Sequence, residues 1–156
     1  MITLLLLAGC DNNMSTLPEK SETKFHTEIG VLNKLISLPK DPITVKWKVN
    51  ESRGSETGSL RALLKFKEED QASIVNDSLS FDKEINDTVS AEIYEGWLTA
   101  DAKAGLEATK EGERYTLNGV FSLQPDLFTK TELSPYVNGS ITPLSGGYIL
   151  VSLYSM

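Results

Sequence analysis

The fold is decided by a stretch of strict alternation, Ile43-Thr44-Val45-Lys46-Trp47-Lys48-Val49, in which every second residue is apolar. A period of two predicts a β-strand with one buried face, and it places Trp47 in the core. The segment 60–67 repeats the pattern, with apolar side chains at its even positions. A polar loop over 50–59 separates the two segments, so we expect them to pair as an antiparallel hairpin.

Outward from this hairpin, the strongest signal is the run Tyr148-Ile149-Leu150-Val151-Ser152-Leu153-Tyr154. This run is apolar on both of its faces, which predicts a central strand that is covered on both sides. A turn over 143–147 and a short strand over 137–142 are expected before it. The segment 115–123 predicts either one bulged strand or two short strands around a tight turn at Asn118-Gly119.

Helical signals lie between the predicted strands. Four helical segments are expected, over residues 27–37, 68–75, 88–97 and 99–106. In the third, Val89, Ile93 and Trp97 recur at intervals of four, which predicts a buried stripe on one helix face. The charged, glycine-containing stretch 107–113 is expected to end the last helix. This pattern predicts a single α+β domain with a largely antiparallel sheet and a few short helices.

Composition limits the classes of function. The chain has 156 residues, and 22 acidic against 15 basic residues give a formal net charge of −7. This length is typical of one domain, and the acidic balance argues against a nucleic-acid partner. A single Cys and a single His exclude an intramolecular disulfide and the zinc sites built from several such ligands. Without a dinucleotide or phosphate-loop motif, we expect no cofactor and no metal.

The beginning of the chain carries a motif. The apolar segment before Cys10 ends in Leu7-Ala8-Gly9-Cys10 and is followed by the polar run Asp11-Asn12-Asn13. An apolar stretch that ends in small residues is typical of a secretory signal. The tetrapeptide resembles the lipobox of bacterial lipoproteins, and this resemblance implies that Cys10 is acylated and becomes the first mature residue. The alternative is a buried strand over 2–8 with a core Cys.

The lipobox divides the chain into three parts. Residues 1–9 are expected to be the remnant of a signal peptide, residues 10–24 the lipidated Cys and a flexible tether, and residues 25–156 the globular domain. The apolar run is shorter than the usual ~15–30 residues and has no Lys or Arg before it, which indicates a basic segment upstream of Met1 or a shortened signal.

The resemblance also implies a location. We expect a lipid-anchored protein of the bacterial cell envelope that faces the periplasm. Asp11 resembles a signal for retention at the inner membrane, but its other interpretation, a solvated residue that opens the tether, is compatible with the outer membrane. The inner and the outer membrane therefore both remain open.

Basic residues gather on the predicted hairpin. An outward face is expected to carry five of them, Lys46, Lys48, Arg61, Lys65 and Lys67. In an acidic protein this face is a candidate docking surface for an anionic partner, either lipid headgroups or an acidic protein. The alternative is an ordinary solvated face that protects the hairpin from aggregation.

Residues suited to catalysis are sparse. The single His26 lies at the start of the predicted domain, where a surface position is expected rather than a catalytic one. The leading hypothesis is therefore a non-enzymatic binding or assembly module that docks an envelope protein or a glycan. The alternative is a small cofactor-free hydrolase or lyase that uses paired carboxylates, for which Glu92 and Glu95 are one candidate pair.

Overall fold

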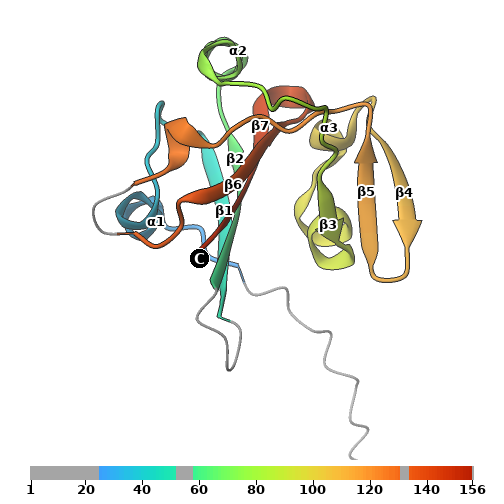
Figure 1. The fold of residues 1–156 in the computed structure, drawn as a ribbon, viewed down its shortest axis with the longest axis horizontal. Helices are drawn as coiled ribbons and strands as arrows, with labels where there is room; N and C mark the ends of the chain where they lie inside the picture. Colours follow the sequence, from blue (N-terminus) through green and yellow to red (C-terminus); the bar gives the residue numbers. More distant parts are fainter. Residues whose placement is uncertain (1–24, 52–57, 131–133, 156) are drawn as a thin grey trace, which may run out of the picture.

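The computed structural model describes residues 25–51, 58–130 and 134–155, and it is an α+β domain with two antiparallel sheets (Figure 1). The first sheet has the strand order β1 (Thr44–Glu51), β2 (Gly58–Lys65), β7 (Tyr148–Tyr154) and β6 (Asn138–Pro143). The second sheet has the order β3 (Thr88–Ser90), β5 (Arg114–Asn118) and β4 (Glu107–Glu111). The predicted fold class is confirmed.

The pairing of the first sheet follows the alternation in the sequence. β1 and β2 form the expected antiparallel hairpin, with Trp47 opposite Ala62. β7 lies between β2 and β6, so the prediction of a central strand is confirmed. Its side chains fill both faces, since Val151 and Leu150 point to opposite sides and both are fully buried.

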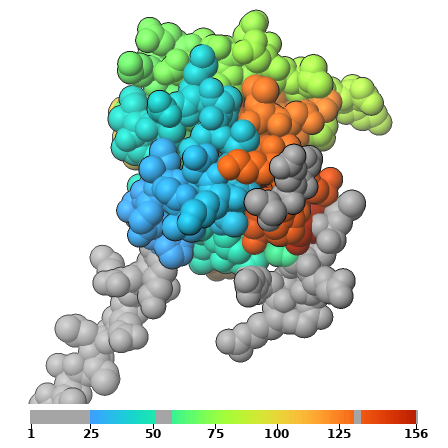
Figure 2. Space-filling view, turned by 90° about the vertical axis from the view of Figure 1, so that its left-hand side faces the viewer, coloured from blue at the N-terminus to red at the C-terminus, as the bar shows by residue number. Residues whose placement is uncertain are grey.

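One side of this sheet, the helix-covered face, packs against α1 (Ile29–Leu35), α2 (Glu68–Asp77) and the 3-10 turn η2 (Asp126–Phe128). Leu32, Ile74 and Phe128 reach it from these three elements and are almost fully buried. Trp47 is 5% exposed, which confirms its predicted place in the core. Figure 2 shows this side of the molecule, where α1 in blue lies near the orange segment that contains η2.

The other side, the sheet-covered face, packs against the second sheet, the π-helical turn η1 (Glu92–Trp97) and α3 (Ala100–Lys103). Leu63 and Leu150 of the first sheet pack here among Val89, Leu117 and Trp97. Figure 1 shows the second sheet standing beside the first as a separate layer. The central sheet is therefore the middle layer of the domain.

The expected helix over 88–97 is wrong in its first part. Thr88–Ser90 forms strand β3, which pairs with β5, and only Glu92–Trp97 is helical, as a single π-turn. All three residues of the predicted stripe, Val89, Ile93 and Trp97, are buried. The spacing therefore identified the core residues but not their backbone conformation. The β-branched pair Thr88 and Val89 favours a strand once β5 is present as a partner.

The stretch 107–113, expected to end the preceding helix, contains a strand that the sequence analysis did not predict: Glu107–Glu111 forms β4, and Gly112 lies in the turn to β5 with φ +60°. β4 is an edge strand with mostly exposed side chains, and such a strand lacks the apolar alternation that marks a buried one. β5 ends at Asn118, and Gly119 follows it with φ +76°.

The remaining helices agree with the sequence within two residues at most ends. α1 and α2 occupy the first two predicted segments, and Thr99 caps α3 by accepting a hydrogen bond from the backbone N–H of Ala102 at 3.2 Å. Among the described residues, none of the helices has the length and apolar character needed to cross a bilayer.

Candidate functional site

The predicted basic face is split by the fold. Lys46, Lys48, Arg61 and Lys65 do share one face of the β1–β2 hairpin, as their spacing predicted. This is the sheet-covered face, so the second layer packs against it rather than leaving it open. Lys67 lies beyond β2 as the N-cap residue of α2 and is exposed. Attraction of an anionic partner to these residues stays a prediction.

Three of these cations contact the second layer directly. Lys46 donates a hydrogen bond to the carbonyl oxygen of Trp97 at 3.3 Å, and Lys48 forms an ion pair with Glu92 at 3.2 Å. Arg61 forms an ion pair with Asp87 at 3.5 Å. Lys65 lies over the ring of Tyr148 and, with Lys67, lines a separate depression of about 480 Å³ that also holds Glu68 and Asp101.

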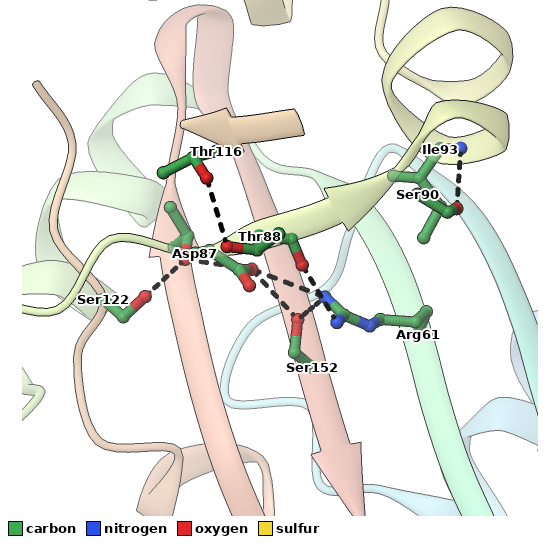
Figure 3. A network of polar contacts seen from close by, with 9 residues as sticks. Arg61, Asp87, Thr88, Ser90, Ile93, Thr116, Ser122 and Ser152 are labelled. Carbon is green, nitrogen blue, oxygen red and sulfur yellow. Dashed lines mark hydrogen bonds and ion pairs between the residues drawn. The ribbon is translucent and has the colours of Figure 1, made fainter. Parts of the chain in front are cut away.

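The Arg61–Asp87 pair is the centre of a polar network between the two layers (Figure 3). Asp87 immediately precedes β3, and its side chain is only 9% exposed. The hydroxyl groups of Ser152 and Thr142 donate to Asp87 Oδ2 at 3.1 and 3.4 Å. Ser122 shares a further hydrogen bond with Thr142 at 2.9 Å, so the network continues into a buried hydroxyl chain.

The Arg61 guanidinium is fixed by the same elements. Nη1 donates to Asp87 Oδ2 at 3.5 Å and to the hydroxyl of Ser152, and Nη2 donates to the carbonyl oxygen of Thr88 at 3.4 Å. Guanidinium has five N–H donors. Within the described part of the chain, the Nε hydrogen and the second Nη2 hydrogen of Arg61 have no such partner. Arg61 therefore connects both layers and still has N–H donors that bond none of the described residues.

A cleft of about 350 Å³ opens beside this network, between the sheet-covered face and the segment that precedes β3. Arg61 and Asp87 line it together with the serines of the first sheet, Ser59, Ser140 and Ser152. These residues come from adjacent strands, since Arg61, Ser152 and Ser140 lie opposite one another across β2, β7 and β6. The register of the sheet thus places these serine hydroxyl groups side by side, where they form one wall of the cleft.

The other wall of the cleft is apolar. Phe81 and Ile85, from the segment before β3, line this wall, and Tyr154 lies at the end of β7. Ile85 is 45% exposed and Tyr154 is 51% exposed, which is high for large apolar side chains. Exposed apolar residues gathered around a cleft indicate a binding surface.

The Asp87 carboxylate has acceptor capacity left over. All the hydrogen bonds and the ion pair that it makes with described side chains end on Oδ2. A carboxylate has about four lone-pair sites on its two oxygens, so Oδ1 remains as an acceptor on a group that lines the cleft. Arg61 and Asp87 thus bring hydrogen-bond donors and acceptors to the lining of the cleft, and these two described charged residues have opposite signs.

A second cluster of polar contacts lies on the surface of the second layer. Tyr94 of η1 stacks on Tyr115 of β5 with ring centroids 4.1 Å apart, and the Tyr115 hydroxyl donates to Glu95 at 2.5 Å. This hydrogen bond and the neighbouring Lys110 lower the pKa of Glu95 below its ordinary value, and the same bond raises the pKa of Tyr115. The cluster is solvent-exposed.

The other predicted residues lie apart from the cleft. His26 is exposed and packs against Trp47 with ring centroids 4.5 Å apart and the ring planes tilted by 31°. Glu92 and Glu95 contact different partners, Lys48 of β1 and Tyr115 of β5, so they do not converge on one point. Cys10 lies outside the described residues. No group of three or more His, Cys, Asp or Glu side chains suited to a metal ion occurs within the described ranges.

The chain has no match among known proteins in three comparisons. Family models, curated proteins and solved structures were all searched, and none matched the chain. The cleft is therefore interpreted from its own residues.

Proposed function

We propose that the chain is a non-enzymatic binding module of the bacterial cell envelope, held at a membrane by acyl chains on Cys10, with the cleft beside Arg61 and Asp87 as its ligand site. The observation that carries the binding function is the cleft itself. Its volume of about 350 Å³ falls within the range of small-molecule sites, which combine apolar walls with a few converging polar groups.

The chemistry of the cleft favours binding over hydrolysis. Hydrolases that work with carboxylates alone need two of them, one on each side of the bond that breaks. Within the part of the chain that the structure describes, Asp87 is the only carboxylate that lines this cleft. It is held by Arg61 and by hydroxyl donors, an arrangement that suits a fixed hydrogen-bond acceptor.

The first described residue lies away from the residues that line the cleft. Phe25, the first described residue, packs edge-on against Trp97 at 5.8 Å and lies near Lys46 of the edge strand β1. The cleft is lined from β2, β7 and β6 instead.

Mass spectrometry of the chain extracted from bacterial membranes tests the anchor. We expect the loss of residues 1–9 and an added diacylglyceryl group on Cys10, because the peptidase and the transferase both act at the lipobox. The matched control is Cys10→Ser, which removes the acylated thiol and is expected to leave the chain uncut. An unmodified chain that retains residues 1–9 and is recovered from the soluble fraction would refute the proposal.

A further inference from the structure

The two walls of the cleft differ in chemistry. On the sheet-covered face, Ser59, Ser140 and Ser152 supply hydroxyl groups, whereas Phe81 and Ile85 supply an apolar surface on the other side. A protein partner usually meets the reverse arrangement, an apolar centre surrounded by a polar rim. A ligand that fits this cleft has one apolar face and several hydrogen-bonding groups along its edge.

The charges of the cleft point to a neutral ligand. Arg61 and Asp87 compensate each other, and among the described residues that line the cleft no other is charged. An anionic ligand would have to compete with Asp87 for Arg61, and a cationic ligand with Arg61 for Asp87. The remaining Arg61 donors and Asp87 Oδ1 together suit a ligand with adjacent groups that both donate and accept hydrogen bonds.

We infer that the cleft binds a neutral saccharide unit. A pyranose ring has hydroxyl groups around its edge and C–H groups on its faces, which matches the hydroxyl wall and the apolar wall of this cleft. Adjacent ring hydroxyls each donate and accept, so one pair can bond Arg61 and Asp87 together. This inference rests on the proposed binding function and specifies its ligand as the glycan, rather than the protein, of the cell envelope.

The test is a titration of the full ¹⁵N-labelled chain followed by amide chemical shifts. The probes are methyl β-glucopyranoside, N-acetylglucosamine, the acyclic polyol sorbitol and an acetylated trialanine amide. Sorbitol carries similar hydroxyl groups without a rigid apolar face, so it is the matched control for the ring. We expect a saturable shift of the amides of Arg61, Ser140 and Ser152 with at least one ring sugar and none with sorbitol.

Variants locate the site. Ile85→Ser removes part of the apolar wall at a half-exposed position and is expected to weaken the binding of the sugar about fivefold or more. Tyr154→Ser does the same from β7. Leu79→Ser changes an equally apolar residue that is 61% exposed but does not line the cleft, and it is expected to leave the affinity unchanged.

Each outcome decides between the two proposals. Saturable binding of a ring sugar that Ile85→Ser weakens and Leu79→Ser does not supports the inference. Binding of the peptide at the same amides, without binding of the sugars, would overturn the inference but leave the binding module in place. If no probe shifts these amides, both the saccharide and the cleft as a ligand site are rejected.

Discussion

Removal of the Asp87 carboxylate should weaken the polar contact between the two layers and lower the stability of the domain. In Asp87→Ala, the Arg61 guanidinium loses its ion-pair partner, and the hydroxyls of Ser152 and Thr142 lose their acceptor. Breaking a fully buried pair costs about 3–5 kcal/mol, but the Arg61 side chain is 24% exposed and water in the cleft can solvate part of it. We therefore expect a loss of about 2–3 kcal/mol in the free energy of unfolding.

A double-mutant cycle separates the interaction from the loss of packing. Urea denaturation of Asp87→Ala, Arg61→Ala and the double variant, followed by tryptophan fluorescence, gives the coupling energy. We expect the double variant to be less destabilised than the sum of the single variants by about 1–2 kcal/mol.

The Lys48–Glu92 pair is the matched control for this cycle. It also connects the two layers, but its side chains are 33% and 37% exposed, so we expect a coupling energy of about 0.5 kcal/mol or less. If the Arg61–Asp87 coupling is no larger than this, the network is an ordinary surface contact and does not hold the layers together.

Two further predictions concern a pair of glycines and a tyrosine. Gly139 has φ +138°, and a Cβ there would lie 1.9 Å from the carbonyl oxygen of Ser152, so Gly139→Ala should lower the free energy of unfolding by about 2 kcal/mol or more in urea denaturation. Gly30→Ala, whose Cβ would meet nothing within 4 Å in α1, should instead raise it by about 0.5–1 kcal/mol, and equal effects of the two changes would contradict the assigned backbone. Because the hydrogen bond to Glu95 raises the pKa of Tyr115 above its ordinary value, Glu95→Gln should move the Tyr115 titration to lower pH in ¹³C-tyrosine NMR spectra. The stabilisation that this bond gives to the folded state is present below pH 10 and is lost as the pH rises through the raised pKa, and an unchanged titration in Glu95→Gln would disprove the hydrogen bond.

The sequence predicts those parts of the fold whose side chains alternate between core and solvent. β1 and β2 were predictable because Val45 and Trp47 face the helix-covered side while Lys46 and Lys48 face the other. β7 was predictable because both of its faces are apolar. β3 and β4 were not, because one has three residues and the other is an edge strand with exposed side chains. Their strand conformation depends on pairing with β5, which a local pattern does not contain.

The candidate site was predictable only in part. Arg61 was singled out as a basic residue of the hairpin, but its partner Asp87 lies 26 residues away and next to a strand that the sequence presented as a helix. The outward direction assigned to the basic face assumed a sheet with one open side. The second layer covers that side of the sheet. It places Asp87 against Arg61 and Glu92 against Lys48, two cations that the alternating pattern predicts to be in solvent.

The position of the cleft follows from two consecutive rows of side chains across the first sheet. On the sheet-covered face, Lys48, Arg61, Ser152 and Ser140 stand in one row, and Asn50, Ser59, Tyr154 and Asn138 stand in the next. Further along the same face, Leu63 and Leu150 pack against the second layer and form core. The two layers therefore make apolar contacts at one end of the sheet and hydrogen bonds at the other. At the hydrogen-bonded end, the small serine side chains do not fill the space between the layers, and the cleft lies there. In the sequence, this arrangement is visible as Ser152 within the apolar run of β7. A polar residue in a strand covered on both sides needs a polar partner in the covering layer, and here that partner is Asp87.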